Sequence, residues 1–237
     1  MKLVNNLIDF IYPRRCPVCH DIVTTKDALV CEECKDGLVK VKDPICLKCG
    51  KPLFNPEKLL CKMCEETDIC FDEGRAVFVY DDAMRKSIYR FKYGQRKEYA
   101  KYYASEIANT YKDKIIRWNV DVIIPIPLHK SKLKKRGFNQ AYLIAKELSY
   151  LTKIPVDNRI LVRSKKTEKQ KDLSAKDRGS NIKNAFKIRG NEVQYLSAML
   201  IDDIYTTGAT MMSSTEVLKR YGVEQVYWMS LSIGRDV

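Results

Sequence analysis

Eight of the nine cysteines occur as four Cys-x2-Cys pairs, and this pattern constrains the fold of the first part of the chain. The pairs recur every fifteen residues and consist of Cys16 and Cys19, Cys31 and Cys34, Cys46 and Cys49, and Cys61 and Cys64. A structural zinc site needs four thiolates, and one Cys-x2-Cys turn supplies two of them. The tight spacing and an expected cytoplasmic location argue against disulfides. Four pairs therefore predict two structural zinc ions.

The spacing of these pairs does not fix which of them share a metal. Each eleven-residue spacer can fold back as a hairpin, so we expect sequential sites, the first within 16–34 and the second within 46–64. A crossed arrangement, first pair with third and second with fourth, is the alternative. Cys70 lies outside the pattern, and we interpret it as a small core or linker residue.

Residues 198–210 read Ala-Met-Leu-Ile-Asp-Asp-Ile-Tyr-Thr-Thr-Gly-Ala-Thr. The apolar run is typical of a buried parallel strand, and a helical pattern follows the loop. Asp202 and Asp203 would then stand at the carboxyl end of a strand, where open α/β sheets bind ligands. A helix start binds phosphate, whereas a carboxylate pair repels it and suits sugar hydroxyls or magnesium. The segment predicts a ribose phosphate site, and it resembles the phosphoribosyl diphosphate (PRPP) motif of type I phosphoribosyltransferases.

The remaining apolar patterns alternate between strands and helices. Strands are expected at 76–80, 120–124 and 226–233, besides the motif strand. A helix containing Met84, Ile88 and Phe91 should be capped by Asp81 or Asp82 and end at 92–94. Further helices are expected at 99–111, at 140–151 and after the motif loop, where Gly222 supplies a stop. This alternation predicts an α/β fold with a parallel sheet and crossover helices.

The net charge of +13 is unevenly distributed. Residues 1–70 carry 11 basic and 11 acidic residues, so all of the excess lies in residues 71–237. A single phosphorylated sugar needs only a few of these cations, and nucleic acid is an expected partner. A solvated basic surface is the alternative. No apolar run approaches the ~18 residues that span a bilayer, and we read 1–12 as a short amphipathic helix of a cytoplasmic protein.

Two basic segments could serve a diphosphate group. The first follows the strand at 120–124, and five of the seven residues from 130 to 136 are cationic. Arg136 and Gly137 are the preferred contacts, because a guanidinium binds phosphate through two donors and glycine permits close backbone approach. His129 is interpreted as a loop hydrogen-bonding residue. The second segment, 163–178, has the composition of a mobile lid or of a surface loop.

These features occur in an order that resembles the ComF family of bacteria, the ComFC type associated with competence for DNA uptake. The zinc pairs come first, followed by Pro-Ile-Pro-Leu…Arg-Gly-Phe-Asn-Gln at 125–140, the basic segment and the PRPP motif. The resemblance covers nearly the whole chain. It implies a double zinc-ribbon module with a short N-terminal helix at 1–70 and a type I phosphoribosyltransferase-like domain at 75–237.

The resemblance also implies roles for particular residues. Asp202 and Asp203 would bind the ribose hydroxyls of PRPP. The loop that would hold the 5′-phosphate consists of Tyr205, Thr206, Thr207, Gly208, Ala209 and Thr210. The residues that would bind the diphosphate with Mg²⁺ are Lys135, Arg136 and Gly137, and those of a flexible loop are Arg163, Gln170 and Arg178.

The purine-salvage enzymes have an acidic general base where this chain has Thr206, so purine salvage is disfavoured and no catalytic residue is assigned. Three functions are consistent with the resemblance. The first is a PRPP-binding protein whose basic surface handles single-stranded DNA during natural transformation. The second is an active phosphoribosyltransferase acting on an unknown base or amine. In the third, the zinc ribbons dock the protein onto a helicase-like DNA-uptake motor.

Overall fold

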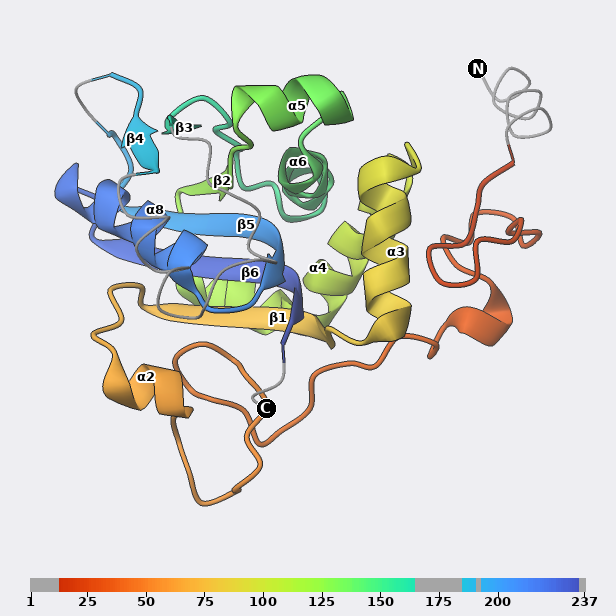
Figure 1. The fold of residues 1–237 in the computed structure, drawn as a ribbon, viewed down its shortest axis with the longest axis horizontal. Coiled ribbons are helices and arrows are strands. Elements are labelled where there is room, and N and C mark those ends of the chain that lie inside the picture. Colours follow the sequence, from red (N-terminus) through yellow and green to blue (C-terminus); the bar gives the residue numbers. More distant parts are fainter. Residues whose placement is uncertain (1–12, 165–184, 191–192, 235–237) are drawn as a thin grey trace.

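The computed structural model describes residues 13–164, 185–190 and 193–234. Its centre is a parallel four-stranded sheet in the order β1-β6-β5-β2 (Figure 1). The strands are β1 (Glu73–Val79), β2 (Val122–Pro125), β5 (Ser197–Tyr205) and β6 (Gln225–Ile233). The predicted α/β class is confirmed, because every pair of neighbouring strands in this sheet is parallel.

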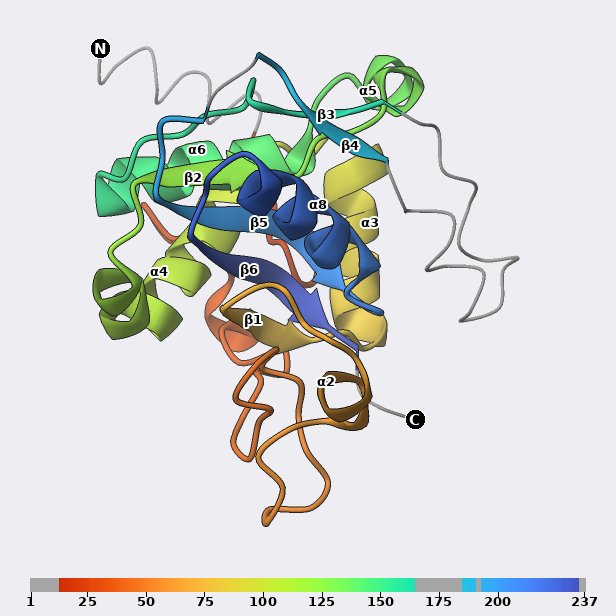
Figure 2. The same ribbon diagram turned by 90° about the vertical axis from the view of Figure 1, so that its left-hand side faces the viewer.

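Helices cover both faces of the sheet. The helices with residues in one core are α3 (Asp82–Tyr93), α4 (Tyr99–Trp118) and α6 (Gln140–Thr152). Helix α8 (Ala209–Arg220) covers the other face and stands in front of the sheet in Figure 2. Beside it lies the antiparallel pair of β3 (Leu161–Arg163) and β4 (Phe186–Ile188). Short helices are η1 (Glu32–Cys34), α2 (Lys62–Glu66) and α5 (Lys130–Arg136).

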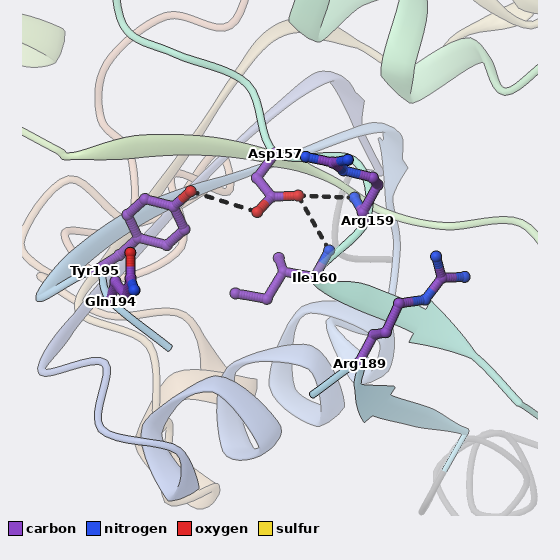
Figure 3. Close-up of a pocket in the computed structure, with 6 residues that line it drawn as sticks. All are labelled: Asp157, Arg159, Ile160, Arg189, Gln194 and Tyr195. Carbon is purple, nitrogen blue, oxygen red and sulfur yellow. Dashed lines mark hydrogen bonds between the residues drawn. The ribbon is translucent and has the colours of Figure 1, made fainter. Parts of the chain in front are cut away.

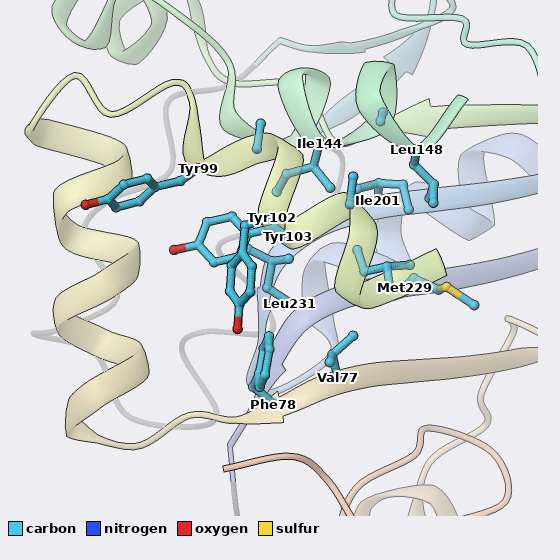
Figure 4. Close-up of a cluster of buried hydrophobic side chains, with 14 of the residues drawn as sticks. Val77, Phe78, Tyr99, Tyr102, Tyr103, Ile144, Leu148, Ile201, Met229 and Leu231 are labelled. Atoms are coloured by element: carbon cyan, nitrogen blue, oxygen red, sulfur yellow. The ribbon is translucent and has the colours of Figure 1, made fainter. Parts of the chain in front are cut away.

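The two cores follow from the alternation of side chains along each strand. On β5, for example, Met199 and Ile201 face α4 and α6, whereas Leu200 faces α8. The first core is rich in tyrosine from α4, and Figure 4 shows Tyr102 and Tyr103 between α3 and the sheet. Strands buried on both faces explain the continuous apolar runs in the sequence.

The ends of α3 follow the predicted capping residues, and α6 begins at a cap that was not predicted. The Asp81 side chain accepts a 2.8 Å hydrogen bond from the Met84 amide, which identifies Asp81 as the cap of α3, and Gly94 ends this helix. Asn139 caps α6 in the same manner by accepting from the Ala141 amide. Local side chains therefore satisfy backbone donors that the first helical turn leaves open.

Several elements differ from the expectations in type or in bounds. Residues 130–136 form helix α5 rather than a loop, and His129 caps it by accepting from the Ser131 amide. Helix α4 extends to Trp118, and its last residues contact the sheet. Strand β5 continues through the acid pair to Tyr205, because Tyr205 still pairs with Ile233 of β6. Long-range strand pairing extends β5 beyond the apolar run that indicated it.

The cysteine-rich segment packs against two separate parts of the sheet domain. The first Cys-x2-Cys turn contacts α3 and α4, where Arg90 Nη1 donates to the Val18 carbonyl at 2.9 Å and Tyr99 Oη donates to the Cys16 carbonyl at 3.0 Å. The third turn contacts β1, where the Gly74 amide donates to the Lys48 carbonyl at 2.8 Å. In the described residues, no helix is both long and apolar enough to cross a membrane.

Candidate functional site

The acid pair lies toward the carboxyl end of the parallel sheet, at the sixth and seventh of the nine residues of β5. Asp202 is paired with Ser230 of β6, and Asp203 follows it with only 4% of its surface exposed. Neighbouring β2 ends at Pro125, beside Ile201. The structure therefore brings the acid pair to the sheet edge at which parallel α/β folds bind ligands.

Asp203 is held by two side chains that the sequence analysis did not identify. Gln140 Nε2, at the start of α6, donates to Asp203 Oδ1 at 3.0 Å. Lys92, near the end of α3, forms an ion pair with Asp203 Oδ2. Burial opposes ionisation of this carboxyl, but the Lys92 ammonium and the hydrogen bonds to Asp203 together outweigh burial and lower the pKa of Asp203. Each carboxyl oxygen of Asp203 thus faces a donor or a cation, which favours the ionised form.

Asp202 has the opposite electrostatic environment. Its Oδ1 accepts a 2.8 Å hydrogen bond from the Asp203 amide, and part of its surface is open to solvent. Burial, followed by the charge of Asp203, raises the pKa of Asp202 well above its ordinary value. Two adjacent carboxyls with divergent pKa values are typical of a ligand site. Asp202 could accept a hydrogen bond from a sugar hydroxyl or from the water of a hydrated cation.

Arg136 joins the basic segment to the acid pair through Gln140. Its Nη1 donates to Gln140 Oε1, and the Gln140 amide nitrogen in turn donates to Asp203. Its Nη2 lies 3.4 Å from the hydroxyl of Tyr93. The structure thus brings Arg136, one of the predicted diphosphate ligands, next to the acid pair's own partner. Lys135 is exposed on α5, and Gly137 ends that helix.

The loop after β5 leads directly into α8. Gly208 precedes the helix with φ of 72°, a left-handed conformation that suits glycine, and none of the described side chains caps the first turn. The leading amides of α8 are therefore available to an anion. Thr206 and Thr207 are at least partly exposed beside them, and Ala209 and Thr210 begin the helix.

Tyr205 supports this loop from below. Its ring is buried and stacks on Trp228 of β6 with a centroid distance of 4.1 Å and an interplanar angle of 9°. A Cβ atom at Gly208 would lie 2.5 Å from the Tyr205 hydroxyl. The side chain of Tyr205 therefore belongs to the core beneath the loop.

Of the predicted flexible-loop residues, Arg163 lies within the described part of the chain. Arg163 ends β3, and its guanidinium lies 5.3 Å from the Phe186 ring centroid. Burial lowers the pKa of Arg163, and the negative charge of Asp202 opposes this shift, which places the two side chains in one electrostatic environment. Gln170 and Arg178 lie outside the described residues.

The cysteines form two sets of four, as the sequential arrangement predicted. Within each set all sulfurs lie within 4.8 Å of one another: Cys16, Cys19, Cys31 and Cys34 form the first set, and Cys46, Cys49, Cys61 and Cys64 form the second. The sulfur distances of 3.8 Å for Cys19–Cys31 and 3.6 Å for Cys49–Cys61 match a tetrahedron with Zn–S bonds of about 2.3 Å. Four thiolates leave no open coordination position, so these sites are structural.

A pocket of about 190 Å³ lies away from the acid pair, beside β3 and β4 (Figure 3). Its lining consists of Asp157, Arg159, Ile160, Arg189, Gln194 and Tyr195. Asp157 already accepts from the amides of Arg159 and Ile160 and from the Tyr195 hydroxyl. None of the predicted site residues lines this pocket, and its carboxylate serves the loop.

Lys92 and Gln140 are the site residues that sequence reasoning missed. Lys92 occurs among several cations on α3, and Gln140 looks like an ordinary first residue of a helix. The one available signal was the position of Gln140 at the start of a helix that follows a strand end. Nothing in the sequence connected Lys92 to Asp203, because only the packing of α3 against the sheet brings them together.

A family model and several protein relatives match the sequence. The double zinc ribbon domain model matches residues 7–65. Competence protein ComFC of Bacillus subtilis is 31% identical over 205 residues, which cover 83% of this chain and 80% of the relative. Competence protein F of Haemophilus influenzae is 43% identical over 45% of this chain and 47% of the relative. DNA utilization protein YhgH of Salmonella typhimurium is 27% identical over 90% and 94%, respectively.

Solved adenine phosphoribosyltransferase structures are also similar. The Leishmania tarentolae structure has 16% identity and a TM-score of 0.32, covering 58% of this chain and 70% of that one. The Trypanosoma brucei structure has 11% identity and a TM-score of 0.38, covering 68% and 83%. These structures add no functional evidence at such low similarity. The Bacillus relative matches most of both chains, and the protein described above is therefore a member of the ComF family of competence proteins.

Proposed function

We propose that the sheet domain binds Mg²⁺-PRPP and that the protein uses this site while handling single-stranded DNA. The observation that carries the PRPP proposal is the order of parts along β5 and α8. A carboxylate pair with divergent pKa values ends the strand, and a helix start without a side-chain cap follows. A ribose phosphate carries hydroxyls and a phosphate on one molecule, so one ligand can use both parts.

Different residues of this site would bind chemically different parts of the ligand. Asp202 would accept from the ribose hydroxyls, while Asp203 stays paired with Lys92 and holds the loop geometry. The leading amides of α8 would bind the 5′-phosphate, and Arg136 with Lys135 would meet the diphosphate. When bound, Mg²⁺ would neutralise charge on that diphosphate and stabilise it as a leaving group.

Support for DNA as a partner comes from charge and from the relatives. All of the net positive charge lies in residues 71–237, the part that contains the sheet. The relatives are described as competence proteins and as a DNA utilization protein. A basic domain binds a polyanion through phosphate contacts and counterion release. We place this activity in the cytoplasm, where thiolates stay reduced and available to zinc.

Calorimetric titration with Mg²⁺-PRPP tests the ligand. Wild-type protein should bind, and Asp202→Ala should weaken binding at least tenfold, because a hydroxyl acceptor is lost. Asp157→Ala, which removes a carboxylate from the separate pocket, is the matched control and should bind normally. Equal binding by both variants, or none by the wild type, would contradict the proposal.

The same preparation separates binding from catalysis. Candidate bases and amines are added with PRPP, and release of diphosphate is measured. Release that depends on Asp202 and on one acceptor would identify an active phosphoribosyltransferase. Tight PRPP binding without release is the outcome that we expect, since Thr206 offers no general base.

Exposed apolar side chains favour docking as a second role for the zinc ribbons. Leu47, Phe54 and Leu59 around the second cysteine set are 54%, 81% and 65% exposed. Large exposed apolar side chains grouped on a small module are typical of a protein contact. We propose a helicase-like motor as the partner. Phe54→Ser should then abolish co-purification with such a motor while both zinc ions stay bound.

A further inference from the structure

Two tyrosine rings stand exposed on one face of α3. Tyr89 and Tyr93 are separated by one helical turn and are 64% and 54% exposed. Their ring centroids are 5.0 Å apart with an interplanar angle of 48°. Aromatic rings normally bury most of their area, so an exposed, adjacent pair is informative. The two rings offer a neighbouring pair of apolar surfaces to solvent.

Arg136 extends this aromatic pair toward the acid pair. Its guanidinium lies 5.2 Å from the Tyr93 ring centroid, within the range of a cation–π contact. Through Gln140 the same side chain is connected to Asp203. Tyr89, Tyr93 and Arg136, named here the tyrosine platform, thus form a continuous surface that begins at the edge of the candidate ligand site.

The helices that carry the tyrosine platform are strongly basic. Helix α5 contains five cations and no acidic residue, and α3 contains four cations and one acidic residue. The most exposed of them are Lys86, Lys130, Lys134 and Lys135. Arg85 and Lys92 are occupied by ion pairs with acidic neighbours. Exposed rings on helices that carry exposed lysines combine an apolar face with a positive potential.

We infer that the tyrosine platform stacks the bases of single-stranded DNA at the entrance of the ligand site. This inference deepens the proposed function and rests on it. Single-stranded nucleic acids present both unstacked bases and phosphates, and proteins bind them with aromatic rings beside cations. A duplex keeps its bases inside, and an acidic peptide has charge but lacks a series of planar rings. The observed surface therefore fits a single strand best.

Fluorescence anisotropy with a labelled oligothymidylate of about 20 nucleotides, longer than one binding site, tests the inference. The double variant Tyr89→Ala/Tyr93→Ala should bind at least tenfold more weakly than wild type, because base stacking is lost. Replacing both rings by phenylalanine should restore binding, since stacking needs no hydroxyl. The slope of the logarithm of affinity against the logarithm of salt concentration should stay unchanged, because the phosphate contacts of the lysines remain.

Tyr150→Ala is the matched control. Tyr150 is a 73% exposed tyrosine near the end of α6 with the Lys153 ammonium 4.7 Å from its ring centroid, so it has the same chemistry at a remote place. This variant should bind the oligonucleotide like wild type. An abasic strand of equal length keeps its phosphates but has no bases, and it should bind wild type and the double variant equally.

The outcomes separate the inference from the proposed function. If the double variant binds like Tyr150→Ala, the tyrosine platform is wrong and DNA handling stands. Equal or tighter binding of a duplex of the same length would overturn base stacking. If wild type binds no oligonucleotide at all, the inference and the DNA part of the proposed function both fail, while PRPP binding is judged separately by calorimetry.

Discussion

The two carboxyls of the acid pair are neighbours in sequence, yet their surroundings shift their pKa values in opposite directions. Lys92 and Gln140 hold Asp203 as a carboxylate, whereas burial and the Asp203 charge disfavour ionisation of Asp202. One residue thus serves the structure and the other keeps its capacity for a ligand. A buried carboxyl that costs folding stability and is nevertheless present is typical of functional sites.

Asp202→Asn should stabilise the protein at neutral pH. The pKa of Asp202 is higher in the folded than in the unfolded protein. Such a carboxyl gives its full contribution to folding stability below its unfolded pKa. This stability is lost as the pH rises through the folded pKa, at about 1.4 kcal/mol per pKa unit. The substitution removes that loss, so Tm should rise by a few degrees at pH 8 relative to wild type and not at pH 4. Thermal unfolding at both pH values measures the difference. A lower Tm at pH 8 would contradict the predicted electrostatics.

Affinity for Mg²⁺-PRPP should depend on the ionisation of the same carboxyl, Asp202. The ionised form of Asp202 is the acceptor for a hydroxyl, so affinity should rise with pH until the pH passes the raised pKa and should then level off. In Asp202→Asn the dependence contributed by this group should disappear. Calorimetric titrations at several pH values check it, and an unchanged profile in the variant would exclude Asp202 as the titrating group.

Lys92→Met should destabilise the protein by about 3 kcal/mol, because the buried Asp203 carboxylate loses its ion-pair partner. Combining it with Asp203→Asn should recover much of this loss, since no buried charge is left unpaired. Denaturant unfolding of the single and double variants gives the coupling free energy. Simple additivity of the two substitutions would mean that the ion pair does not form in solution.

At the scale of elements, the turn between β5 and α8 determines the candidate phosphate position. Gly208 both adopts a positive φ and lies over the Tyr205 ring, which leaves no space for a side chain. The PRPP motif predicted this strand–loop–helix correctly, because its apolar run, loop and helical pattern are local features. The same local reasoning missed α5, whose apolar content is too low to indicate a helix.

Gly208→Ala should weaken Mg²⁺-PRPP binding at least tenfold and lower stability by roughly 2 kcal/mol, through the positive φ and the contact with Tyr205. Gly222→Ala is the control: Gly222 has φ of 98° just after the same helix, but a Cβ there meets no atom within 4 Å. It should cost less stability and leave binding intact. Equal binding losses in both variants would show that the close contact over Tyr205 is unimportant.

At the scale of the whole molecule, the second cysteine set is part of the core that supports the candidate site. All four of its cysteines belong to the same buried cluster as Tyr205 and Trp228. The Gly74 amide donates to the Lys48 carbonyl between two of these cysteines, and Phe71 contacts Trp228 edge to face. The first set instead packs against α3 and α4. Zinc loss should therefore have different consequences at the two sites.

Purified protein should contain about two zinc ions per chain, measured by elemental analysis. Cys49→Ser should lower zinc content to about one and weaken Mg²⁺-PRPP binding severalfold, because the Tyr205–Trp228 stack below Gly208 loosens. Cys19→Ser should lose the other zinc ion with a smaller effect on PRPP. A larger effect of Cys19→Ser would place the supporting role in the first ribbon.

The sequence by itself determined the eight zinc-ligating cysteines, the parallel α/β class, the capping of α3 by its Asp-Asp start and the strand–loop–helix around the acid pair, whereas only the structure decided which cysteines share a metal. Each of these features depends on the spacing of residues that are close together in the sequence, and such a spacing is compatible with only a few conformations. Only the tertiary structure decided that Lys92 and Gln140 hold Asp203, that Tyr205 joins the zinc-site core, and that Arg136 meets Tyr93. These contacts join residues far apart in the chain, and packing of helices against the sheet, rather than any local pattern, brings them within reach.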